Sequence, residues 1–145
     1  MKKLLLLSIT LFAFISISKA QISAGVNIQS SETFVTVGTD PSKQLFGEGR
    51  IGTGGDIGVE LMGAYNIVQR DDVNFYAGLG LGLDDDRNNN KHDDDDDIYV
   101  AIPIGLHITP FNSKNLGLVL EAAPILATDH GDYFRAGFGF KYTFR

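Results

Sequence analysis

The acidic segment at residues 84–97 is the part of the sequence whose composition comes nearest to a metal-binding loop. Asp84, Asp86, Asn88 and Asp95 have the spacing of positions 1, 3, 5 and 12 of an EF-hand calcium loop. The segment lacks the glycine of position 6, ends on aspartate instead of a bidentate glutamate, and has no flanking helices. The pattern therefore favours a solvated acidic loop without a specific metal site. The negative electrostatic potential of such a loop could attract divalent cations or basic partners.

A second candidate for chemistry is Asp129-His130-Gly131-Asp132, where a histidine and carboxylates are close enough to act as an acid–base pair. Acyl transfer also requires an activated nucleophile and an oxyanion hole, and no serine lies nearby in the sequence. Aspartate and glycine are common turn residues, so a surface turn accounts for this segment. We therefore expect no catalysis and no cofactor.

Four isolated charged residues interrupt segments in which every second residue is apolar: Glu60, Glu121, Arg135 and Lys141. All four fall on the face opposite the apolar residues, and His107 falls there too, as a hydrogen-bonded interior residue. A charge in a narrow interior must be paired or hydrated, because burying it alone is costly. Two interpretations stay open: an ion-paired network that fills the interior, with Arg135 or Lys141 reaching Glu121, or a gate whose pairs exchange to pass ions.

The segments that carry these charges have the period-two alternation of strands with one apolar face. Five are well marked, at residues 57–67, 73–83, 98–109, 116–123 and 133–144. Three weaker ones precede them, at 22–29, 33–37 and 45–51, the last with the weakest pattern. Eight strands of about ten residues fit the chain. Pro103 lacks an amide hydrogen in mid-strand, which predicts a bulge beside His107.

The face opposite the apolar one decides between two all-β architectures. A soluble sandwich or barrel would expose this face to water, where glycine weakens a strand and packs nothing. The interior of a small barrel is only just wide enough for side chains, so glycine suits it, and the apolar face then meets lipid. The pattern favours a single antiparallel up-and-down transmembrane β-barrel. The glycines concerned are Gly58, Gly78, Gly80, Gly82, Gly105, Gly117, Gly137 and Gly139.

We assume that the last strand runs toward the periplasm and trace the earlier strands back from it. The short turns then lie on the periplasmic side. The longest connection, 84–97, then lies on the outer surface, which is the asymmetry expected of such barrels. Aromatic residues of the apolar face gather near the periplasmic ends of their strands and predict half of an aromatic girdle. They are Tyr65, Phe75, Tyr142 and Phe144, with Phe111 in the adjacent turn.

The first twenty residues predict a cleaved secretory signal peptide and leave residues 21–145 as one barrel domain. A basic start precedes 14 nearly uninterrupted apolar positions, and small residues precede the expected cleavage after Ala20. The 18 acidic residues all remain, whereas three of the 12 basic ones are removed, so the net charge becomes −9. Such acidity excludes a basic nucleic-acid-binding surface. The absence of cysteine excludes a disulfide framework.

The final strand resembles the C-terminal signature of bacterial outer-membrane β-barrels, in which aromatic residues alternate up to the chain end. The matching residues are Phe138, Phe140, Tyr142 and Phe144. Arg145 follows the last aromatic residue, so the signature is displaced by one position. The whole pattern is similar to the small eight-stranded barrels of the OmpA, OmpX and OmpW type. The resemblance implies that the assembly machinery of the outer membrane reads these four residues.

The sequence favours a small monomeric barrel of the bacterial outer membrane with a structural or surface-interaction role. Its expected partners are outer-membrane lipid, the barrel assembly machinery, and divalent cations or basic molecules at the acidic loop. Two alternatives stay open: a narrow ion channel or porin, and a soluble periplasmic β-barrel that carries a ligand.

Overall fold

The computed structural model describes residues 21–53, 58–84, 97–110, 113–128 and 131–145. Within them the chain forms nine strand segments and no helix long and apolar enough to cross a membrane. The segments are β1 (Ile22–Gln29), β2 (Thr33–Thr39), β3 (Leu45–Gly52), β4 (Val59–Gln69), β5 (Val73–Asp84), β6 (Asp97–Ala101), β7 (Ile104–Ile108), β8 (Leu116–Ala127) and β9 (Tyr133–Phe144).

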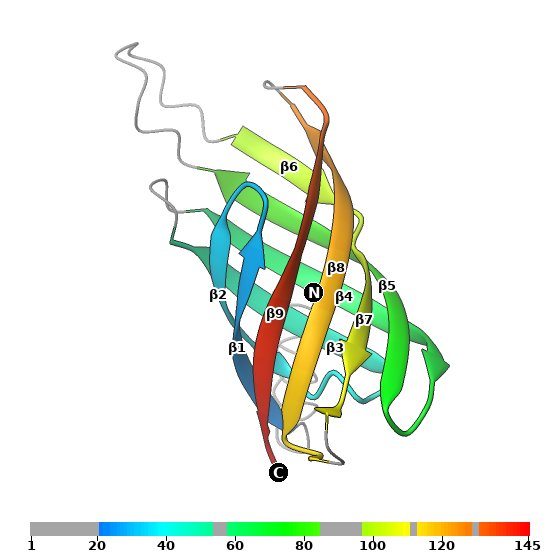
Figure 1. Cartoon of the computed structure of the whole chain (residues 1–145). Coiled ribbons are helices and arrows are strands. Elements are labelled where there is room, and N and C mark those ends of the chain that lie inside the picture. Colours follow the sequence, from blue (N-terminus) through cyan, green and yellow to red (C-terminus); the bar gives the residue numbers. More distant parts are fainter. Residues whose placement is uncertain (1–20, 54–57, 85–96, 111–112, 129–130) are drawn as a thin grey trace, which may run out of the picture.

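The strands pair antiparallel into one closed sheet (Figure 1). Each strand pairs with the next one in the sequence, except β6 with β7, and β9 returns to pair with β1, so the described strands leave no free edge. The short segments β6 and β7 both lie between β5 and β8, so together they occupy one position of an eight-position barrel. The predicted all-β, eight-stranded up-and-down barrel is confirmed, including the weakly patterned strand at 45–51.

The predicted bulge at Pro103 is wrong. Gly80 pairs with Ala101 on one side of the proline and Ala77 with Ile104 on the other, so the register continues without an extra residue. The pairing of this strand with β8 is equally continuous. The proline lacks a ladder donor but still accepts through its carbonyl, from the Gly78 amide at 2.8 Å. It therefore interrupts the strand without shifting it.

Side chains alternate along every strand between the outside and the interior of the barrel. The outward positions are apolar and exposed, as Leu79 and Leu81 on β5 illustrate, at 65% and 63%. Tyr65, Phe75, Tyr142 and Phe144 all point outward near the end of the barrel where the chain finishes. The predicted girdle residue Phe111 lies outside the described residues.

The two ends of the barrel differ in what connects the strands. We call the end that holds residues 40–44, 70–72, 109–115 and 145 the C-terminal mouth, which is the lower end in Figure 1. The opposite end, where the strands that flank residues 30–32, 53–58, 85–96 and 128–132 begin and end, is called the acidic mouth. The connection 40–44 packs into the C-terminal mouth, where Asp40 is 1% exposed and Arg145 donates to its carboxylate at 3.2 Å.

Candidate functional site

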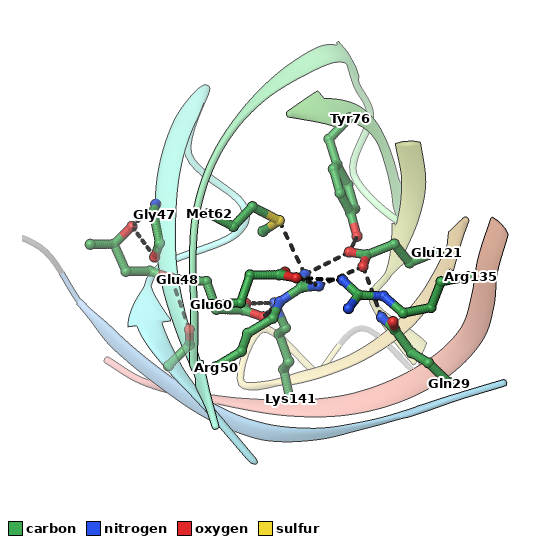
Figure 2. A network of polar contacts seen from close by, with 12 residues as sticks. Gln29, Gly47, Glu48, Arg50, Glu60, Met62, Tyr76, Glu121, Arg135 and Lys141 are labelled. Carbon is green, nitrogen blue, oxygen red and sulfur yellow. Dashed lines mark hydrogen bonds and ion pairs between the residues drawn. The ribbon is translucent and has the colours of Figure 1, made fainter. Parts of the chain in front are cut away.

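A network of charged side chains fills the middle of the barrel around Arg50 (Figure 2). The Arg50 side chain is fully buried and donates from all three of its nitrogens. Two nitrogens bind the two carboxylate oxygens of Glu121, each at 2.7 Å, in the bidentate geometry that makes arginine–carboxylate pairs strong. Further bonds go to Glu48 at 2.9 Å and to Glu60 at 3.1 Å.

Two more cations complete the network and bring its net charge to zero. Arg135 donates to Glu60 at 2.6 Å, and Lys141 donates to Glu48. Three carboxylates thus face three cations, all of them buried. Because an unpaired charge would be costly in this enclosed space, the balance is what allows so many charges to be buried. We call these six residues the lumen network.

Glycine on the inner face lets neutral side chains reach the network across an intervening strand. Tyr99 of β6 and Glu60 of β4 both stand in register with Gly82 of β5, and the tyrosine hydroxyl bonds Glu60 over that glycine at 3.0 Å. A Cβ atom at Gly82 would overlap the Tyr99 ring.

The same arrangement recurs twice around Glu121. Tyr76 donates to Glu121 at 2.6 Å across Gly105, which is in register with both. Gln29 donates to Glu121 at 2.9 Å across Gly137, again in register with both. At each of these inner-face glycines, side chains of the two flanking strands therefore hydrogen bond to each other across the strand between them.

The structure places the predicted residues Glu60, Glu121, Arg135 and Lys141 together inside the barrel. Arg135 and Lys141 pair with other carboxylates than Glu121, because Glu121 lies opposite Gly137 and takes Arg50 as its cation. Arg50 and Glu48 were not predicted. The sequence feature that could have revealed them is that both are charged and stand two positions apart in the segment 45–51. The inner face of this segment could be assigned only once the segment was known to be a strand.

Among the other predicted interior residues, His107 is 4% exposed. Its ring fills the space where a Cβ atom at Gly117 would lie.

The other predicted sites are the acidic segment 84–97, the segment 129–132 and the aromatic residues of β9. Asp86, Asn88, Asp95, Asp129 and His130 are outside the described residues, and of Asp84 only the backbone, at the end of β5, is described. No group of three or more metal-ligating side chains occurs in the described ranges.

Gly131 has a φ of 77°, a left-handed conformation typical of a turn glycine. The four aromatic residues of β9, Phe138, Phe140, Tyr142 and Phe144, are all exposed on the outer face.

The gap at Gly82 can be tested with a single methyl group. We expect Gly82→Ala to destabilise the barrel by about 1–3 kcal/mol, because the methyl displaces the Tyr99 ring and breaks its bond to Glu60. The free energy of unfolding in urea, measured on the refolded barrel in detergent, reports the change. Gly63→Ala is the matched control, since nothing lies within 4 Å of a Cβ atom there. Equal effects at both sites would contradict the proposed gap.

The charge balance of the lumen network can be tested by a double substitution. Arg50→Met leaves Glu121 without a cation, and we expect a loss of about 3–5 kcal/mol in the same unfolding measurement. Adding Glu121→Gln restores neutrality, so Arg50→Met/Glu121→Gln should be more stable than Arg50→Met alone. The exposed Arg70→Met serves as the control for loss of an arginine, with a change below about 0.5 kcal/mol. Additive losses in the double variant would refute a coupled network.

No protein-family model matches the chain, and no curated protein is similar to it in sequence. Two solved structures are similar in fold. The N-terminal β-barrel domain of Pseudomonas aeruginosa OprF aligns with a TM-score of 0.61 at 16% identity, over 86% of this chain and 96% of that one. The Yersinia pestis outer membrane protein Ail, determined in phospholipid bilayer nanodiscs, aligns with a TM-score of 0.51 at 13% identity, over 87% and 100%. The chain therefore has the fold of the small eight-stranded outer-membrane barrels, as the resemblance of its final strand implied.

Proposed function

We propose that the chain is a small β-barrel of the bacterial outer membrane whose interior is closed by the lumen network. It serves a structural or surface-interaction role without catalytic activity. The expected signal peptide at residues 1–20 supports export, and the two similar solved structures are barrels of the same architecture. In this proposal the barrel is a monomer in contact with outer-membrane lipid, and the assembly machinery recognises the aromatic residues of β9.

The observation that carries the proposal is where the charged residues lie. Among the strand residues whose side chains are described, every outward position lacks aspartate, glutamate, lysine, arginine and histidine. A barrel in water gains nothing from an uncharged apolar exterior, whereas one in lipid requires it. The continuous apolar exterior thus favours the membrane barrel over a soluble ligand carrier.

The remaining charges of residues 21–145 are divided unequally between the two ends. The C-terminal mouth carries three acidic and four basic residues, a net charge of +1. In the sequence, the connections of the acidic mouth together with the strand-end residues Asp84 and Asp97 carry 12 acidic and two basic residues, a net charge of −10. With the neutral lumen network these account for the whole charge of −9. An end of such strong negative potential supports a surface role that involves cations or basic molecules.

A charge placed at mid-height on the outer face tests the membrane location. We expect Leu79→Arg to cost about 2–4 kcal/mol in lipid and to reduce the folded, heat-modifiable band in detergent extracts of the membrane fraction. Leu45→Arg is the matched control, because Leu45 is equally outward but begins β3 at the C-terminal mouth, where the cost falls to about 0–1 kcal/mol. Recovery of the native protein in the soluble wash, or identical behaviour of both variants, would contradict the proposal.

Planar-bilayer recording tests whether the lumen network closes the barrel. We expect the native barrel to show no steady openings, since ions would have to displace bonded pairs of buried side chains. Steady openings that disappear in Glu121→Gln or Arg135→Gln would instead support the ion-channel alternative. Arg70→Gln, which lies outside the network, controls for a general effect of charge.

A further inference from the structure

The C-terminal mouth contains a polar cleft that the proposed barrel function does not use. Its volume is about 390 Å³, within the range of small-molecule sites. Three cations line it, Arg70, Lys114 and Arg145, against one carboxylate, Asp71. The lining side chains therefore carry a net charge of +2 in a chain whose net charge is negative, although one of the cations, Arg145, is already paired with Asp40 behind the wall.

The cations differ in how far they are already engaged. Arg145 donates to Asp40 at 3.2 Å and to the Ser42 hydroxyl at 3.1 Å, which fixes its guanidinium at the wall of the cleft. The side chains of Arg70 and Lys114 have no hydrogen-bond or ion-pair partner within the described part of the chain. Both are exposed at the cleft, so their charge is available to a ligand.

A buried amide adds a neutral donor to the same cleft. Asn74 is only 5% exposed and lines the cleft, and its Oδ1 accepts from the Arg70 backbone amide at 3.3 Å. Its Nδ2 has no hydrogen-bond partner among the described residues. A mostly buried donor at the wall of a cleft, with no partner in the described part of the chain, is a feature expected of a ligand site.

We propose that this cleft binds a phosphate group. Its donors come from four separate elements: the turn after β4, the start of β5, the connection between β7 and β8, and the chain end. An anion that meets donors from several directions needs oxygens pointing in several directions, which a tetrahedral phosphate has and a planar carboxylate lacks. Asp71 is the one carboxylate among the lining residues, and the three lining cations outnumber it.

Free phosphate and the headgroup of a phospholipid both supply this chemistry. The outward aromatic residues Tyr65, Phe75, Tyr142 and Phe144 surround the same end of the barrel. In the proposed membrane location such residues lie at headgroup level, so the headgroup source rests on that proposal. Binding of free phosphate does not depend on it.

Titration of the full chain in an uncharged sugar detergent, followed by amide NMR shifts at Arg70, Asn74 and Thr109, tests the site. One arm adds inorganic phosphate and the other adds short-chain phosphatidylglycerol, both at constant ionic strength. We expect saturable shifts at these three amides in at least one arm, and the arm that responds identifies the source.

Substitutions connect such a response to the cleft. Arg70→Gln and Lys114→Gln should each weaken binding by about three- to fivefold, and the two together by about tenfold or more. Lys43→Gln removes a charge from the same mouth outside this cleft and should change binding by less than about twofold. The absence of saturable shifts in both arms would overturn the proposal. So would a double variant that binds as tightly as the native chain, and so would an equal loss in Lys43→Gln.

Discussion

The bidentate pair between Arg50 and Glu121 is the interaction on which the interior of the barrel depends. It joins β3 to β8 across the lumen, and every other charged contact of the lumen network attaches to one of its members or to their partners. The cost of burying these charges is offset because the pair is fully hydrogen bonded: Arg50 uses all its nitrogens and Glu121 both its oxygens. The same requirement couples β3 and β4 to β8 and β9, two strand pairs that are far apart in sequence, since a change in one charge leaves another buried without its partner.

The glycine gaps follow from that requirement. A carboxylate such as Glu60 has more acceptor positions than its cations can fill, and neutral donors must come from strands two positions away. Such a donor reaches the carboxylate only if the strand between them has no side chain at that height, as at Gly82. Glycine costs strand stability, but here it allows a polar group to be satisfied that would otherwise be buried without a partner.

The barrel itself could be predicted from the sequence because strand alternation is a local property. Each segment shows its apolar face without reference to its neighbours, so strand positions and outward aromatic residues such as Tyr142 followed directly. Partners across the lumen depend on strand register, which no single segment contains. This is why Glu121 was expected beside Arg135 or Lys141, and why Arg50, in the least regular segment, was missed. The bulge predicted at Pro103 was wrong for a related reason. The missing amide donor predicts that the strand is interrupted there, but not whether an extra residue is inserted.

The low identity to barrels of the same fold has the same physical origin. The outer face must only be apolar and uncharged, and many residues satisfy that condition, so sequences can diverge to 13–16% identity while the strands stay in place. The interior is different, because a network of three carboxylates and three cations tolerates change only when charge is exchanged in matched pairs. The outward pattern thus specifies the fold, whereas the lumen network and the charge at the two mouths depend on particular residues of this chain. Individual function is therefore to be sought in the interior and at the two mouths.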